Sequence, residues 1–308
     1  MGLRLISDKT QLNFFKYRFF SFGGSILFSI ISLILFFIFG LNYGIDFKGG
    51  ILIEIKTTEN MSVSQLRNNL KNLNLGEISI QEFGSSDNIL MRIERQPGDD
   101  KNQQIAIEKI RNLMADTYGE DIVEYRRVEF VGPTVSKDLI RNGIIAVILA
   151  IGAMLIYIWF RFELPFALGA VFALINDIIL TIGVFVITGL EYNLATVAAI
   201  LLIIGYSMND TVVIFDRIRE NLRKYRKLPL NDLLDKSINE TLNRTVNTTA
   251  TTILALGALY FIGGQIIRDF SFAMIWGILV GTYSSIFIAS PLLFYFKLRP
   301  NENKLEKN

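Results

Sequence analysis

Two polar residues interrupt a long apolar stretch in the second half of the chain, and one of them is ionisable. The stretch begins at Leu194 and reads LATVAAILLIIGYSMNDTVVIF, with Asn209 and Asp210 near its end. An ionisable side chain inside a membrane helix costs about 2.5–3.5 kcal/mol on insertion scales, and it usually faces the interior of a helix bundle. We therefore take Asp210 as a candidate titrating group. The alternative is a structural carboxylate that bonds to a neighbouring helix.

A carboxylate in this setting can bind and release a proton when a cation moves toward it or away from it. Burial disfavours the ionised form, whereas a nearby guanidinium favours it. Arg244 is the candidate cation because it begins another apolar segment, and Tyr206 lies one turn before Asp210 on the same helix face. Arg244 also fits a simple anchor at the membrane surface. The polar residues that follow it indicate a wet interior face; they are Thr245, Asn247, Thr248, Thr249, Thr251 and Thr252.

A second carboxylate, Asp177, lies beside Asn176 in another apolar segment. It fits either a member of a proton relay or a group that packs two helices together, and the sequence favours neither. Small residues four positions apart predict close helix packing at Gly277 and Gly281, and in looser form at Gly169 and Ala173.

Composition excludes several kinds of chemistry. The chain has no cysteine and no histidine, so disulfides, Cys/His metal sites and nucleophiles activated by histidine are excluded. It carries no P-loop, dinucleotide glycine fingerprint or HExxH motif. We therefore expect no catalytic residues, no metal, no cofactor and no enzyme activity. A gradient of protons or of sodium is the expected energy source, since one charge crossing 100 mV yields about 2.3 kcal/mol.

The elements that position these residues are membrane spans. The chain has 308 residues, of which 51% are hydrophobic, and a bilayer core needs about 20 apolar residues per helix. The sequence predicts a first transmembrane helix over 21–41 and five more within 143–296. The apolar windows are 21–40, 143–160, 165–188, 194–215, 242–264 and 270–296.

Basic residues predict the orientation of these spans. They cluster in the N-terminal segment 1–20, in a predicted loop over 216–241 and in the tail 297–308. Six spans place all three on the same side, the cytoplasm, so both termini are expected there. The first span is too long for a typical signal peptide, and we interpret it as an uncleaved anchor.

Residues 42–142 are predicted to form one domain on the outer, periplasmic side. Alternating apolar residues from Ile51 to Ile55 indicate a strand, and strand-like and helix-like patterns then follow in turn. The predicted order is β-α-β-β-α-β, which is typical of an α+β ferredoxin-like domain. Other α+β domains could give the same pattern. The fold class is thus a six-helix membrane protein with one α+β outer domain.

Five motifs resemble the SecD/SecF family of the resistance-nodulation-division (RND) superfamily, and most of them its SecF branch. They are GIDFKGG at Gly44 to Gly50, VEFVGPTVSKDL at Val128 to Leu139, GYSMNDTVVIFDRIREN at Gly205 to Asn221, SINETLNRTVNTTATT at Ser237 to Thr252 and GTYSSIFIASPL at Gly281 to Leu292. The resemblance covers nearly the whole chain, and the motifs occur in the family's order.

The resemblance implies a subunit that pairs with SecD, joins the SecYEG channel, often with YajC, and assists late export of preproteins across the bacterial inner membrane. It implies contact with the translocating chain and with membrane lipid, and no nucleic acid. It implies a proton pathway at Asp210, Arg244 and Thr248, with Asn209 in the same motif. Lys48 departs from the signature, where Thr is more usual. The signature residues that open the outer domain are Gly44, Asp46, Phe47, Gly49 and Gly50.

Two other classes of function remain as alternatives. A half-transporter of the same superfamily could export lipids or small molecules by proton antiport, but such exporters carry a second fused half or larger outer domains. A membrane hydrolase could use Asp177 and Asp210 as a carboxylate pair, although nothing in the sequence places the two together.

Overall fold

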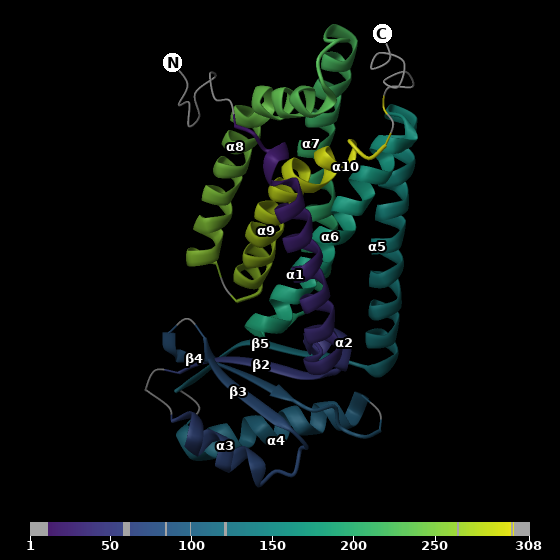
Figure 1. Ribbon diagram of the computed structural model, residues 1–308. Helices are drawn as coiled ribbons and strands as arrows, with labels where there is room; N and C mark the ends of the chain where they lie inside the picture. The colour runs from purple at the N-terminus through teal and green to yellow at the C-terminus, as the bar shows by residue number, and fades with distance from the viewer. Residues whose placement is uncertain are drawn as a thin grey trace. The chain divides into compact units, whose positions relative to one another are not determined.

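The chain folds into two units, shown as a computed structural model in Figure 1. The structure describes residues 12–57, 62–83, 85–98, 100–119, 122–263, 265–296 and 298. A helical unit comprises the N-terminal part to Asn42, Ile145–Leu190 and the chain from Ala195 onward. A sheet unit comprises Tyr43–Ile144 and the short segment Glu191–Leu194.

Six helices of the described chain are long and apolar enough to cross a membrane. This confirms the predicted number of spans, and the protein is a multi-pass membrane protein. The helices are α1 (Arg18–Phe39), α5 (Pro133–Arg161), α6 (Leu164–Thr188), α7 (Leu194–Lys224), α8 (Leu230–Ile262) and α9 (Gln265–Ser284).

Burial differs strongly among these helices. The apolar window of α5 is only 6% buried, whereas that of the last span, Ile267–Leu292, is 61% buried. Helix α9 packs against both α6 and α8, and α6 packs against α1 (Figure 1). The centre of the helical unit is therefore formed by α6, α7 and the last span, whose apolar windows are 44%, 56% and 61% buried.

The sheet unit contains four antiparallel strands in the spatial order β3-β4-β2-β5. Helices α3 and α4 cover one face of this sheet (Figure 1), and their apolar residues pack on Ile51, Ile53 and Ile55. The predicted β-α-β-β-α-β order is confirmed. The elements are β2 (Gly50–Thr57), α3 (Val63–Lys71), β3 (Ile78–Phe83), β4 (Ser85–Ile93), α4 (Asp100–Tyr118) and β5 (Val123–Val131).

Three short elements were not expected from the sequence. Strand β1 (Asn42–Tyr43) directly precedes the signature, which forms one helical turn, α2 (Ile45–Lys48). Strand β1 pairs with β6 (Glu191–Tyr192), which lies between α6 and α7. These elements are too short for a periodic pattern, so hydropathy could not reveal them.

The predicted loop over 216–241 is wrong in its secondary structure. Helix α7 continues to Lys224 and α8 begins at Leu230, so only a short connection separates them. Charged residues stabilise these extensions through ion pairs, including Arg217 to Glu220 at 2.6 Å and Lys236 to Glu240 at 3.2 Å. The predicted domain boundary at 142 lies within α5, which begins at Pro133, and close to Ile144, where this part of the sheet unit ends.

Candidate functional site

Asp210 is buried in the middle of α7, with 3% of its surface exposed. Its carboxylate accepts a hydrogen bond from the Thr282 hydroxyl of α9. Thr282 in turn lies 2.9 Å from the hydroxyl of Thr249 on α8. Oδ2 of Asp210 is buried without a hydrogen-bond partner among the described residues. The carboxylate therefore sits where three helices meet and has one oxygen available for a proton or an ion.

Tyr206, one turn before Asp210, connects α7 to the polar face of α8. Its hydroxyl donates to the carbonyl oxygen of Thr248 at 3.1 Å and lies 3.0 Å from Oγ1 of Thr252. The Thr248 hydroxyl lies 3.0 Å from the carbonyl oxygen of Arg244. The polar stripe predicted on α7 thus reaches α8 at the residues that follow Arg244.

Arg244 and Asn209 are placed differently from Asp210. Arg244 lies within electrostatic range of the Asp210 carboxylate, but its side chain is exposed. Within the part of the chain that the structure describes, no ion pair joins the two. Asn209 is also exposed and lies outside the buried cluster. Adjacent residues on a helix point about 100° apart, so Asp210 and Asn209 cannot face the same neighbour.

Asp177 forms a second buried cluster, between α6, α7 and α9. Its side chain is fully buried, and Oδ2 accepts hydrogen bonds from Ser207 at 2.7 Å and from Ser284 at 2.9 Å. Thr211 and Ser285 extend the cluster with a contact of 2.7 Å between their hydroxyls. No described hydrogen bond joins Asp177 to Asp210, and each carboxylate has hydroxyl partners of its own.

The sequence did not single out Ser207, Thr282 or Ser284 as partners of the carboxylates. Two features of the last span bring these hydroxyl groups close to the carboxylates. Gly281 allows close packing, since a Cβ atom at that position would lie 2.8 Å from Cβ of Ser207. A π-helical turn, η2 (Ser285–Ala289), interrupts the span before α10 (Ser290–Leu292). Such turns shift the direction of side chains and are frequent at functional sites.

The packing predicted for small residues is confirmed. A Cβ atom on Gly277 would overlap the side chain of Ile203, and one on Gly169 would lie 3.3 Å from the carbonyl oxygen of Ala289. Ala173 is buried.

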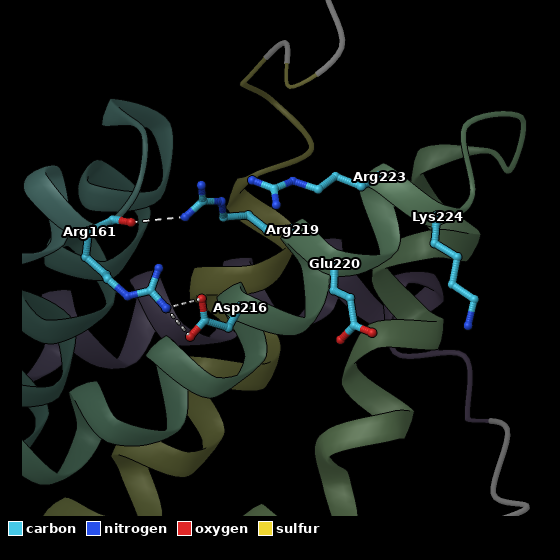
Figure 2. Close-up of a pocket in the computed structure, with 6 residues that line it drawn as sticks. All are labelled: Arg161, Asp216, Arg219, Glu220, Arg223 and Lys224. Atoms are coloured by element: carbon cyan, nitrogen blue, oxygen red, sulfur yellow. Dashed lines mark hydrogen bonds and ion pairs between the residues drawn. The ribbon is translucent and has the colours of Figure 1, made fainter.

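A separate cavity of about 560 Å³ lies at the C-terminal ends of α5 and α7 (Figure 2). Arg161 donates to both carboxylate oxygens of Asp216 at 2.9 Å, and Arg219 donates to the backbone carbonyl of Arg161 at 3.0 Å. Arg223 and Lys224 add two exposed cations. The cavity contains none of the predicted site residues. The described ranges contain no group of three or more His, Cys, Asp or Glu residues that could hold a metal ion.

Comparison with known proteins identifies the family. Residues 110–299 match the family described as protein export membrane protein SecD/SecF, C-terminal, and residues 34–60 match the SecD/SecF GG motif. The protein translocase subunit SecF of Rickettsia bellii is 45% identical over 294 residues, which cover 96% of each chain. The chain belongs to the SecD/SecF family. The SecF of Rhodobacter capsulatus is 41% identical over 314 residues, covering 98% of this SecD/SecF chain and 94% of the relative.

Solved structures agree with this assignment. The crystal structure of SecDF from Thermus thermophilus, a translocon-associated membrane protein, matches with a TM-score of 0.83 and 34% identity. A second SecDF structure, in a super-membrane-facing form, matches with a TM-score of 0.71 and 33% identity. They cover 96% and 100% of this SecD/SecF chain, which spans only 40% and 41% of theirs. The predicted resemblance to the family is confirmed.

Proposed function

We propose that the chain is a SecF-type subunit of the accessory complex of the Sec preprotein translocase. Together with SecD it uses the proton motive force to assist late-stage protein export across the bacterial inner membrane. SecF-named relatives that match over nearly their whole length support this role. The larger SecDF chains, of which this chain spans about two fifths, support pairing with SecD. SecYEG, and YajC with it, are the proposed further partners, and both termini lie in the cytoplasm.

The single observation that carries the coupling proposal is the buried carboxylate of Asp210. It has one hydrogen bond, from Thr282, one buried oxygen without a described partner, and the charge of Arg244 within electrostatic range. Asp210 alternates between a protonated state away from Arg244 and an ionised state paired with it. Because no ion pair joins them in this structure, an approach of α8 to α7 is the step that releases the proton.

Thr248 supports this step because of its place on α8. Its backbone carbonyl accepts the Tyr206 hydroxyl, so a movement of α8 relative to α7 must break or rebuild this contact. Asn209 and Arg244 are exposed in this chain alone, and they are the polar groups that a SecD partner would cover.

The test is gradient-dependent preprotein export by the complex with SecD in reconstituted vesicles. Asp210→Asn should reduce the gradient-stimulated rate by at least about tenfold, because an amide does not exchange the proton. Asp216→Asn is the matched control: it removes a carboxylate from the same helix, but one that is 44% exposed and paired with Arg161. Unchanged export with Asp210→Asn would refute proton coupling. An imposed sodium gradient, tested in parallel, identifies the ion.

A further inference from the structure

The short segment between α6 and α7 belongs to the sheet unit. Residues Glu191–Leu194 group with that unit, although Leu190 before them and Ala195 after them belong to the helical unit. Leu194 is also the first residue of α7, the helix that carries Asp210. The sheet unit therefore holds the beginning of the helix on which the proposed coupling depends.

The GIDFKGG signature makes the contacts that hold this segment. The Gly44 amide donates to the carbonyl oxygen of Tyr192 at 2.9 Å, and Oδ2 of Asp46 accepts the Leu194 amide at 2.8 Å. The rings of Phe47 and Tyr192 lie 5.7 Å apart. We call these contacts the signature clamp.

An ion pair from the sheet strengthens the signature clamp. Arg92 on β4 binds Glu191, and only 16% and 12% of their side chains are exposed. An ion pair that is largely withdrawn from water is screened less by salt than a surface pair. The sheet itself, and not only the signature loop, is therefore attached to the segment before α7.

The glycines of the signature are explained by this geometry. A side chain at Gly44 would collide with Oε1 of Glu191, and at Gly50 a Cβ atom would lie 2.6 Å from the carbonyl oxygen of Ile93. Gly49 and Gly50 also adopt φ angles of 72° and 127°, which favour glycine. The two glycines place α2 against the start of β2, and Gly44 leaves room for the segment that α2 binds.

Asp46 acts as a helix cap from a distant part of the chain. The first amide groups of a helix have no partner within it, and a carboxylate near that end is stabilising. Asp46 supplies this carboxylate to α7 from 148 residues away in sequence. Asp210 follows about 24 Å further along the same continuous helix.

We propose that the signature clamp transmits movement of α7 to the sheet unit, with Asp46, Arg92 and Glu191 as positioning residues. The proposal rests on the proposed function, in which α7 and α8 move when Asp210 gains or loses a proton. The clamp fixes the Leu194 amide, at the start of α7, to the sheet unit through Asp46. With the clamp in place, the sheet unit moves when the first turn of α7 moves.

The test uses Asp46→Ala in the complex with SecD, with Asp46→Asn as the matched control. Alanine removes the acceptor of the Leu194 amide, whereas asparagine keeps an acceptor oxygen. Asp46→Ala should speed hydrogen exchange at the Leu194 amide about tenfold, within the range for loss of a capping side chain. It should also remove the gradient stimulation of export. Asp46→Asn should keep most of the protection of the Leu194 amide and most of the gradient stimulation.

A charge exchange tests the ion pair of the clamp separately from the helix cap. Arg92→Glu and Glu191→Arg should each lower the gradient stimulation of export, because each variant brings two like charges together in a largely buried pair. The double variant restores an ion pair with its charges reversed and should recover gradient stimulation. If the double variant is no better than either single variant, the ion pair does not transmit movement, and the proposal is wrong.

The remaining outcomes are also decisive. Full gradient stimulation in Asp46→Ala would refute transmission, even if hydrogen exchange at the Leu194 amide is faster. A wild-type complex without gradient stimulation would refute the proposed function instead. In that case hydrogen exchange alone tests the signature clamp. Unchanged protection of the Leu194 amide in Asp46→Ala would refute the clamp.

Discussion

The hydroxyl of Ser207 on α7 donates a 2.7 Å hydrogen bond to the buried carboxylate of Asp177 on α6. Ser284 donates to the same oxygen from α9, so one carboxylate joins three helices. Ser207 lies one turn before Asp210. Asp177 therefore contacts α7 one turn away from Asp210, but each carboxylate has its own hydroxyl partners. We infer that Asp177 fixes the helix positions around Asp210, the proposed site of proton exchange.

Asp177→Asn tests this division of roles. Asparagine has nearly the same shape and keeps an oxygen that can accept from Ser207 and Ser284. We expect gradient-dependent export to stay within about threefold of wild type, since only the charge of the acceptor changes. Asp177→Leu leaves both serines without their acceptor, and it should destabilise the protein by about 1–3 kcal/mol in thermal unfolding. Loss of gradient dependence in Asp177→Asn, at the level seen for Asp210→Asn, would instead identify a proton relay.

Thr282→Val removes the hydroxyl that binds Asp210 and keeps the shape of the side chain. The variant should lower gradient-stimulated export about tenfold, because the ionised carboxylate loses a hydrogen bond in a buried site. Thr282→Ser keeps the hydroxyl and should recover most of the rate. Equal export by the valine and serine variants would show that the hydroxyl has no part in coupling.

Gly281→Ala tests the close packing of α9 on α7. The added methyl would lie 2.8 Å from Cβ and 3.0 Å from Oγ of Ser207. We expect a loss of about 1–3 kcal/mol in unfolding free energy, typical of overpacking. Gly257→Ala on α8 is the matched control, since no heavy atom lies within 4 Å of its Cβ position. It should be neutral or stabilising by up to about 1 kcal/mol. Equal effects of the two changes would contradict the packing argument.

The sequence predicted the membrane spans because bilayer thickness fixes their length and apolar character. It did not predict the helical extensions to Lys224 and from Leu230, since charged residues such as Arg217 and Glu240 interrupt the apolar run there. Leu233, Leu234 and Ile238 nevertheless recur at helical spacing and are buried. The strands of the sheet unit were predicted because side-chain alternation is strict at Ile51, Ile53 and Ile55, all fully buried.

The candidate site was predicted in its charged members and at Thr248, whereas the hydroxyl groups of Ser207, Thr282 and Ser284 were missed. A buried aspartate is rare enough in an apolar helix to be singled out, whereas serines and threonines are common in membrane helices. Which hydroxyl reaches Asp177 or Asp210 depends on helix rotation, and the π-helical turn after Ser284 changes that rotation locally. The contact between Asp46 and Leu194 spans 148 residues, and no local sequence pattern predicts it.

Tyr192, in the signature clamp, gives a prediction for alkaline pH. Burial, with a smaller contribution from Tyr43, raises the pKa of its phenol from 10.0 to about 12. Between these values the unfolded chain has already released the proton and the folded chain retains it. The unfolded state then binds fewer protons, so stability falls as pH rises through this window.

The measurement is unfolding of the chain between pH 9 and pH 12, with Tyr192→Phe as the control because phenylalanine keeps the ring and has no proton to release. Wild type should lose stability more steeply with rising pH than Tyr192→Phe. The difference should begin near the ordinary pKa of tyrosine, about 10. The ultraviolet absorbance of wild type minus that of Tyr192→Phe reports the phenolate of Tyr192, and this phenolate should form near pH 12. Parallel stability curves would mean that Tyr192 reaches water freely and that the signature clamp does not enclose it.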